Sequence, residues 1–269
     1  MCWPGCNRAC LIIMRAEQRS AISAVAGRVT GEGIVLFALL AWWALSRGLP
    51  EFILPGPVPV ARRLVELFTM PDFIWHLYTS TWRVFVSIAA ALLIGGGLAF
   101  LAHGVASLEA VVDERIKPVL NSFPSIGWAI LAAIWFDPGH FGVIFVEVAI
   151  LIPFCLINIA EGLRNIDREL TEMGQSFTRH RLRILRRLTL PLLAPYGLSA
   201  ARIAYGIAWK IALVAELLGA PSGLGYLMLR AQTAADSSTF LAICFAIVLI
   251  FVAGERLMIV PLERHFAPR

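Results

Sequence analysis

Five side chains inside long apolar segments carry the chemistry that this chain could perform. They are four charged residues and one tryptophan: Arg83, Glu147, Trp209, Lys210 and Glu216. A charge at the centre of a bilayer costs roughly 2.5–3.5 kcal/mol, so such residues face protein or water rather than lipid. Glu147 and Lys210 could form an ion pair with each other or with another helix, or they could line a polar path. Trp209 could equally form a wall of such a path or pack between helices.

Composition places these residues in an all-α, polytopic membrane protein. The chain has 269 residues, of which 59% are hydrophobic and 15% charged, and its mean hydropathy is +0.77. A soluble domain carries roughly 25% charged residues, so the excess apolar surface needs lipid as its solvent. The net charge of +5 requires no nucleic acid as a partner, because basic residues collect on cytoplasmic loops. Cys2, Cys6 and Cys10 lack a fourth ligand, so no metal site is predicted.

Six apolar runs fit the length of the chain. We expect spans at about Gly33–Leu45, His76–Leu101, Ile116–Phe136, Phe141–Ile159, Leu192–Leu218 and Phe240–Val260. The expected organisation is a cytoplasmic tail, a single transmembrane domain and a second cytoplasmic tail: residues 1–32, 33–260 and 261–269. The small residues Gly95–Gly97 would let another helix approach the second span closely. Between the first two spans, Pro59–Phe68 has the pattern of an amphipathic helix lying on the membrane surface.

Basic residues set the expected orientation of the spans. With the N-terminus inside, the inner segments hold 16 of the 23 arginines and lysines, and the outer segments hold 4. Both termini and the most polar internal segment, Glu161–Pro195, then lie in the cytoplasm. This segment contains seven arginines, from Arg164 to Arg187, between two apolar spans. Such a segment in so apolar a chain indicates a partner outside the membrane.

The polar segment has the pattern of two short helices. Asp167 can cap a first helix that runs through Glu172. Thr178–His180 has the composition of a turn, and a second helix starts at Arg181. Leu190–Pro191 is expected to end this second helix and to start the next span. A helical knob of this kind suits insertion into a groove, where its arginines can pair with acidic residues of a partner.

The same segment resembles the coupling loop of ABC importer permeases, whose pattern is E-A-A, three residues, Gly, nine residues and I-x-L-P. Glu172–Gly174 falls on E-A-A, Thr178 falls on the glycine, and Leu188–Pro191 falls on I-x-L-P. Two alanines of the pattern are replaced, and Thr178 does not favour the positive φ that glycine allows. The resemblance implies that a separate ATPase docks on these residues: Glu172, Met173, Gly174, Thr178, Arg179, Arg183, Leu190 and Pro191.

Segments on both sides of this loop resemble the taurine, alkanesulfonate and nitrate branch of the same family. Downstream, the similar elements are Ala208–Trp209, Val214–Glu216 and Ser222–Tyr226. Upstream, they are LPGPVPV, TSTWRV around Arg83, and FPSIGWAILAAIWF. The resemblance covers about residues 33–260, with the motifs in one register. After the fifth span, the candidate contacts for a solute-binding protein are Ser222, Gly223 and Gly225.

The resemblance implies a permease subunit of a type I ABC importer in a bacterial inner membrane. Two permease chains would form the solute path, two cytoplasmic ATPases would bind ATP and Mg²⁺, and a periplasmic or lipid-anchored protein would deliver the solute. This chain contains no G-x-x-x-x-G-K-[ST] motif and no catalytic residue that we identify, so hydrolysis belongs to the partner. Arg83 or Lys210 in the path would favour an anion such as a sulfonate, taurine, nitrate or bicarbonate.

Other classes of protein remain open from the residues alone. A stand-alone secondary transporter of a small anion would fit six spans, but the chain shows no clear internal repeat. An intramembrane enzyme would need a His/Glu metal cluster or a Ser–His or Ser–Lys constellation, and the spans contain neither. The solute could also be a pyrimidine vitamin precursor or a flavin. The partner permease could be a second copy of this chain or a related chain.

Overall fold

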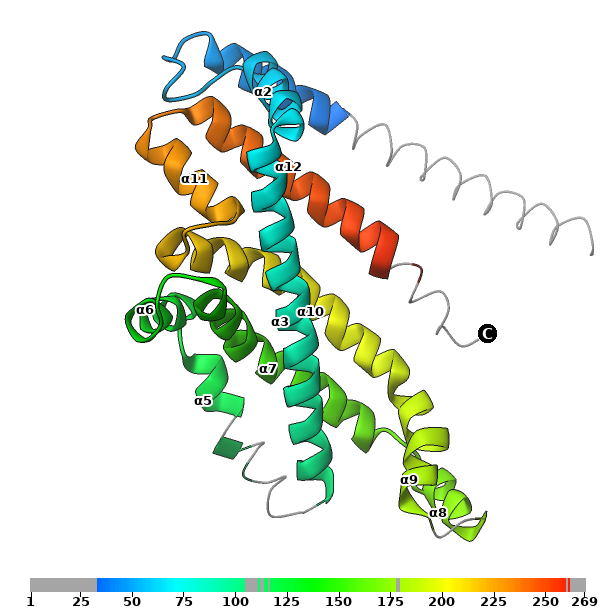
Figure 1. Ribbon diagram of the computed structural model, residues 1–269. Coiled ribbons are helices and arrows are strands. Elements are labelled where there is room, and N and C mark those ends of the chain that lie inside the picture. The colour runs from blue at the N-terminus through cyan, green and yellow to red at the C-terminus, as the bar shows by residue number, and fades with distance from the viewer. Residues whose placement is uncertain are drawn as a thin grey trace, which may run out of the picture. The chain divides into compact units, whose positions relative to one another are not determined.

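The computed structural model describes residues 33–104, 111, 114–115, 117–177, 180–259 and 261. The chain divides into two compact units, Met1–Arg62 and Arg63–Arg269, and each is considered by itself. Every regular element in the described ranges is a helix (Figure 1), which confirms the predicted all-α class. Helices suit so apolar a chain, because each helix satisfies its backbone hydrogen bonds within one segment.

The first unit contains the apolar helix Gly33–Ser46. Trp42 Nε1 donates to Pro55 O at 3.1 Å, which ties this helix to the proline-rich stretch that follows it. The guanidinium of Arg47 lies 3.7 Å from the ring centroid of Trp43, at the end of the helix. The described part of this helix covers about 21 Å.

Helix α2, Pro57–Thr69, confirms the amphipathic helix predicted at Pro59–Phe68. Its buried residues Val60 and Leu67 are two helical turns apart, whereas Arg62 is exposed. One face of α2 is therefore buried through apolar side chains, while its charged residues lie on the others and apolar residues such as Val65 are exposed beside them. Its location on the membrane surface stays a prediction.

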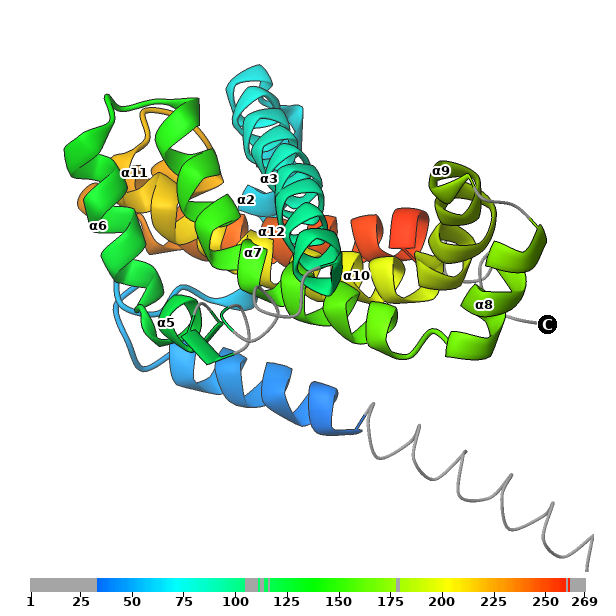
Figure 2. The ribbon, with the colours of Figure 1, turned by 90° about the horizontal axis from the view of Figure 1, so that it is seen from below.

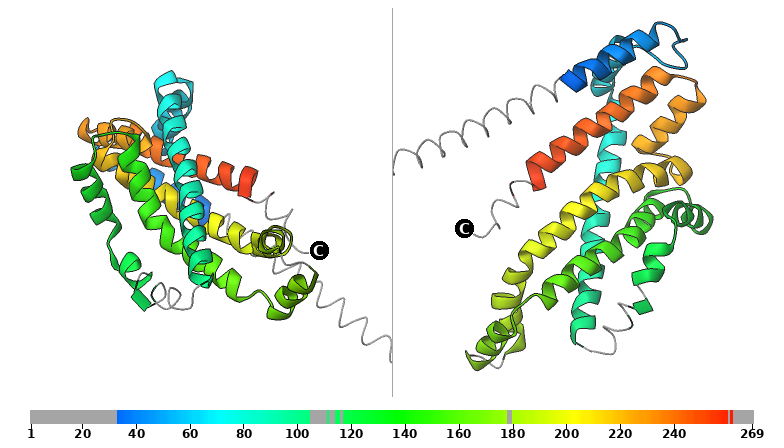
Figure 3. Two further views of the ribbon diagram at one scale, coloured as in Figure 1. Left: turned by 60° about the horizontal axis from the view of Figure 1, so that its bottom comes forward. Right: turned by 180° about the vertical axis from the view of Figure 1, so that it is seen from behind.

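The second unit is built on four helices that are long and apolar enough to cross a membrane. They are α3 (Pro71–Gly104), α7 (His140–Arg164), α10 (Leu190–Gly219) and α12 (Ser237–Gly254). Three short elements extend them: α9 (Arg181–Ile184) and η2 (Leu185–Thr189) lead into α10, and η3 (Glu255–Ile259) continues α12. Helices α3, α7 and α10 pack against one another (Figures 1 and 3). The four long helices lie at the predicted second, fourth, fifth and sixth spans.

The third span, expected at about Ile116–Phe136 with interruptions at Pro118 and Pro124, is interrupted at Pro124 as predicted but not at Pro118. The chain forms α5 (Lys117–Ser122), whose first turn contains Pro118, and α6 (Ser125–Trp135), which are separated at Pro124. Pro124 has φ −65° and ψ 135°, an extended conformation, and it lacks the N–H that a continuous helix would use. In the described ranges, the six predicted runs therefore appear as four long helices and two short apolar ones.

Glycines bring α3 and α7 together, as predicted. A Cβ at Gly95 would lie 2.9 Å from Ile152 O, so the two helix backbones touch at this point. A Cβ at Gly96 would meet an α7 side chain at 3.0 Å, whereas one at Gly97 would meet nothing within 4 Å. The close approach is thus confirmed for the first two glycines of the run and not for the third.

Replacement of Gly95 by alanine is expected to destabilise the fold by about 1–3 kcal/mol, because the added methyl must separate two backbones. Gly97→Ala is the matched control, since its methyl enters open space on the same helix. Alanine there is expected to be neutral or to stabilise by up to about 1 kcal/mol. Thermal unfolding in detergent measures both. Equal melting temperatures for the two variants would contradict the packing described above.

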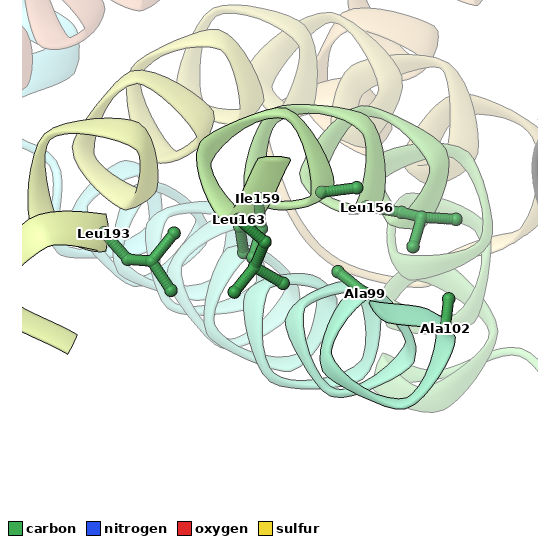
Figure 4. Close-up of a cluster of buried hydrophobic side chains, with 7 residues drawn as sticks. Ala99, Ala102, Leu156, Ile159, Leu163 and Leu193 are labelled. Carbon is green, nitrogen blue, oxygen red and sulfur yellow. The ribbon is translucent and has the colours of Figure 1, made fainter. Parts of the chain in front are cut away.

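Two apolar clusters fix α10 against its neighbours at both ends. Where α3, α7 and the start of α10 meet (Figure 4), the buried residues are Ala99, Ala102, Leu156, Ile159, Ala160, Leu163 and Leu193. A Cβ at Gly162 would lie 2.6 Å from Tyr196 Cγ, so this glycine allows α10 to approach α7. At the other end, α6, α7 and α10 bury a second cluster: Ala129, Ala132, Val143, Val146, Ile211, Ala215 and Ala220.

Asp236 fixes the turn between α11 (Leu224–Thr233) and α12. Its Oδ1 accepts from the Thr239 N–H at 3.0 Å and its Oδ2 from Thr239 Oγ1 at 2.6 Å. Burial disfavours the charged carboxyl, but these hydrogen bonds and the nearby Arg63 outweigh it and lower the pKa of Asp236. Arg63 also donates from Nε to Thr239 Oγ1 at 2.8 Å, which ties α2 to the start of α12.

Helix α10 connects the two ends of the second unit. Its first turns follow η2 and α9, next to α8 (Arg168–Phe177), and its last turns contact α6 and α11 (Figures 1 and 2). At 1.5 Å per residue, its 30 residues cover about 45 Å. A single packed helix of this length can carry a displacement from one end to the other.

Candidate functional site

A fully buried ion pair joins α3 to α10. The side chains of Arg83 and Glu216 are both 0% exposed, and Nη1 of the arginine lies 2.8 Å from Oε1 of the glutamate. Removing two charges from water is costly, and a buried pair is stable only where further hydrogen bonds satisfy the remaining donors and acceptors. The surroundings of the pair therefore decide what it does.

Residues 220–225, which comprise the connection from α10 to α11 and the first two residues of α11, supply many of these partners. Arg83 donates from Nη1 to Ser222 O at 2.7 Å and from Nη2 to Ser222 Oγ at 2.8 Å. Gly225 N–H donates to Glu216 Oε2 at 3.0 Å. Ser80 Oγ lies 2.8 Å from both Glu216 oxygens and accepts from the N–H of Leu224 at 2.8 Å. The ion pair thus holds the 220–225 segment against α3.

Two glycines are required for this arrangement. Gly223 has φ +115°, and a Cβ there would overlap the Glu216 carboxyl group. A Cβ at Gly225 would collide with Leu213 O and would lie 2.8 Å from the Glu216 Cβ. The glycines of the Ser222–Gly225 motif therefore let the backbone approach a buried carboxyl closely enough to donate to it.

Two histidines complete the network: His76 is buried, whereas His140 is exposed. His76 Nδ1 accepts from the Gly223 N–H at 2.9 Å, and its Nε2 lies 3.5 Å from Asp72 Oδ1. His140, the first residue of α7, accepts from Arg83 Nε through its Nδ1 at 3.2 Å. The guanidinium of Arg83 therefore contacts α7, α10 and the 220–225 segment at once. We call this set the buried network: His76, Ser80, Arg83, His140, Glu216 and Ser222–Gly225.

The buried network unites five of the sequence-predicted candidates and adds three that were missed. Arg83 and Glu216 were proposed for the solute path, and Ser222, Gly223 and Gly225 for contact with a binding protein. The missed residues are His76, Ser80 and His140. The sequence did contain a signal for His76 and Ser80. Polar residues on α3 recur at positions 76, 80, 83 and 87, and this helical spacing places them on one face.

The polar segment after α7 forms the predicted first helix. α8 begins after Asp167, whose Oδ1 accepts from the Glu169 N–H at 3.0 Å. Glu172 and Met173 are exposed on this helix. Two further candidates, Thr178 and Arg179, lie outside the described residues, and so does most of the predicted turn.

The prediction of a separate second helix that ends at Leu190–Pro191 is wrong. α9, η2 and α10 form one continuous helix from Leu182 to Gly219. Pro191 causes no break, and the turn that precedes it, η2, is a π-helix rather than an α-helix. Arg183, Leu190 and Pro191 are exposed. The polar segment is therefore the direct extension of α10.

Gly174 packs α8 against this extension. A Cβ at Gly174 would lie 3.1 Å from Leu188 Cδ2 and 3.6 Å from Ile184 Cγ2. The glycine thus sits at the crossing of α8 with α9 and η2, and a large side chain would push the two helices apart. We call residues 167–191 the coupling hairpin.

The three remaining candidates lie apart from the buried network's contacts. Glu147 is fully buried on α7, and neither of its carboxyl oxygens has a hydrogen-bond partner among the described residues. Trp209 is buried on α10, with its ring centroid 6.4 Å from that of Tyr205. Lys210, the next residue, is exposed and forms no ion pair within the described ranges. The pairing of Glu147 with Lys210, one of the two alternatives, is absent there.

Comparison with known families decides the class of protein. Residues 33–259 match the family described as the inner membrane component of binding-protein-dependent transport systems. The chain belongs to this family. It is therefore a permease subunit of an ABC importer, and the alternatives of a secondary transporter and an intramembrane enzyme are set aside. The match covers the predicted transmembrane domain almost end to end.

Relatives of the permease lie in the branch that the sequence motifs indicated. The permease described here is 30% identical over 202 residues to the aliphatic sulfonates transport permease protein SsuC of Escherichia coli K12. The alignment covers 72% of this chain and 74% of that protein. It is 25% identical over 248 residues to the taurine permease TauC of the same organism, covering 88% of each. The nitrate import permease NrtB of Synechococcus elongatus is 24% identical over 225 residues, covering 80% and 81%.

Solved structures of ABC importers share the permease's fold. A chain of the inward-facing MetNI methionine transporter matches with a TM-score of 0.56 and 19% identity, covering 72% of this chain and 99% of that one. A chain of a bacterial transporter that imports alginate matches with a TM-score of 0.62 and 16% identity, covering 96% and 98%. At these identities the likeness concerns the fold alone.

Proposed function

We propose that the permease imports a small organic or inorganic anion and that Lys210 lines the path. Two permease copies would enclose the path, and two ATPases, which hold the ATP and Mg²⁺, would dock on the coupling hairpins. Both termini and the hairpin would lie in the cytoplasm, as the basic residues predict. A solute-binding protein would dock at the opposite end, near the 220–225 segment.

The exposure of Lys210 is the observation that carries the anion assignment. Ile203, Lys210 and Val214 are exposed at spacings that place them on one face of α10. A lysine inside an apolar span is costly against lipid, so this face meets water or protein in the assembled transporter. Arg83 is a weaker candidate for the solute, because its charge is balanced by Glu216 and its donors are engaged.

The named solutes of the relatives support the same class. Aliphatic sulfonates and nitrate are anions, and taurine carries a sulfonate group. An ammonium donates strong, charge-assisted hydrogen bonds to such oxygens. Bicarbonate fits the same chemistry, whereas a neutral vitamin precursor or a flavin would not need the lysine.

Lys210→Met is expected to reduce uptake of the anionic solute by about tenfold or more, since a hydrogen bond to a charged group contributes roughly 1.5–3 kcal/mol. Lys210→Arg keeps the positive charge and is expected to retain most of the uptake. The measurement is uptake of labelled sulfonate, taurine and nitrate in vesicles that contain the full transporter. Normal uptake by Lys210→Met would remove this residue from the path.

The 220–225 segment is the proposed platform for the binding protein. Gly223 and Gly225 are buried, so we propose that they shape the segment, while the exposed Pro221 and part of Ser222 face the partner. The ion pair beneath the segment then links the docking surface to α10, and through α10 to the coupling hairpin. This connection gives a physical route between the events at the two ends of the transporter.

A further inference from the structure

Two polar groups in the core of the permease have no partner in the buried network. Both carboxyl oxygens of Glu147 on α7 and Oγ of Ser87 on α3 are buried without a well-formed hydrogen bond among the described residues, although these two side chains are close enough to interact with each other. Each of the two residues is 0% exposed. They lie on the pair of helices that pack most closely through Gly95.

An unpartnered carboxyl in a membrane span demands an explanation. Buried polar groups are hydrogen-bonded in the great majority of native structures, because leaving one without a partner is costly. Ionisable residues within spans mostly pair with each other or face a polar cavity. In a protein that moves between two arrangements, a group without a partner in one of them can be paired in the other.

Arg83 is the donor best placed to serve Glu147. Ser87 follows Arg83 by one helical turn on the same face of α3. On α7, His140 already accepts from Arg83 Nε, and Glu147 follows that histidine by two turns. The charges of Arg83 and Glu216 both act on the Glu147 carboxyl. Other described cations of the spans fit less well, since Lys210 is exposed and Arg202 pairs with Glu255 at 3.2 Å.

We propose that Glu147 is the alternate counter-ion of Arg83, reached when the 220–225 segment leaves its position on α3. In the arrangement described above, the guanidinium is held by Glu216 and Ser222. Departure of the segment removes both hydrogen bonds to Ser222. Arg83 then turns along α3 toward Glu147, with Ser87 as an additional acceptor. The exchange gives the buried cation a counter-ion in both arrangements, Glu216 in the held one and Glu147 in the released one.

This exchange predicts opposite effects on stability and transport for Glu147→Leu. In the present arrangement the carboxyl has no partner, so an apolar side chain of similar size should raise the melting temperature by a few degrees. In the released arrangement, Arg83 would lack the counter-ion that Glu147 provides, so segment release and uptake should both fall by about tenfold. Glu147→Asp keeps the carboxyl and is expected to restore most of both. A merely structural glutamate would not separate the two readouts.

Amide hydrogen exchange measures the release of the 220–225 segment directly, and the measurement does not require the solute to be known. The amides of Gly223, Leu224 and Gly225 donate to His76, Ser80 and Glu216 in the held arrangement. The experiment compares their exchange in the permease–ATPase complex with and without trapping by ADP and vanadate. We expect trapping to speed exchange in the wild type and in Glu147→Asp, and not in Glu147→Leu.

Three results would overturn the proposal. One is a lower melting temperature for Glu147→Leu, which would mean that the carboxyl is already paired. Another is an unchanged acceleration of exchange in that variant. The third is the absence of any acceleration in the wild type, which would show that the segment is not released. The inference rests on the proposed transport cycle, and wild-type uptake measured in parallel reports on that function separately.

Discussion

Arg83→Ala is expected to abolish uptake and to destabilise the permease by about 3–5 kcal/mol, the range for removing one partner of a buried charge pair. The substitution leaves Glu216 buried with its counter-ion missing and frees both acceptors of Ser222. The 220–225 segment would then lose its main contacts with α3. Thermal unfolding of the purified permease and uptake by the assembled transporter measure the two effects.

Paired variants separate the ion pair from simple loss of volume. Arg83→Lys keeps the charge but cannot reproduce the fork of donors to Glu216, Ser222 and His140, so an intermediate result is expected. A double change to leucine at Arg83 and Glu216 removes both charges together. It should be more stable than either single change, because no charge remains unpaired. An Arg83→Ala permease with wild-type stability would contradict the buried network as described.

Glu172→Arg and Gly174→Trp are expected to uncouple ATP hydrolysis from transport. Glu172 is exposed on α8, where a reversal of charge would alter a contact with the ATPase. Tryptophan at Gly174 would separate α8 from Leu188 and change the shape of the coupling hairpin. Coupling between distant sites is typically worth about 1–3 kcal/mol, so we expect uptake per ATP hydrolysed to fall by about tenfold or more.

Proteoliposomes that contain the permease, the ATPase and the binding protein provide this ratio. Gly197→Ala is the matched control, because a methyl at this position of α10 meets no neighbour within 4 Å. It should leave both activities unchanged. Wild-type coupling in both hairpin variants would show that the hairpin is not the contact with the ATPase.

The sequence predicts the helices well wherever an apolar run is long and uninterrupted. Periodicity and composition place the four long helices, and the charge pattern isolates the coupling hairpin. The prolines show the limit of the pattern. Pro124 interrupts its apolar run as predicted, whereas Pro191 does not end a helix, because the helix continues through it behind the π-helical turn η2. The sequence pattern contains no signal for such a turn, so this continuation could not be predicted.

The sequence predicted which residues form the candidate site but not how they contact one another. Arg83, Glu216 and the glycines of the 220–225 segment could be selected because charges inside spans and glycine-rich turns are unusual. Their mutual contacts could not be predicted, since Arg83 and Glu216 are 133 positions apart in the chain. The same holds for Glu147, whose lack of a partner appears only once every neighbour is placed.

Affinity purification of the tagged permease from its native membrane, in a mild detergent, tests the central claim most directly. We expect mass spectrometry to identify an ATPase with a Walker motif and a solute-binding protein that are recovered with the permease. The recovered complex is expected to hydrolyse ATP. The recovered binding protein can then be tested with sulfonates, taurine and nitrate. Recovery of the permease alone, without ATP hydrolysis, would contradict the proposed assembly and the role given to the coupling hairpin.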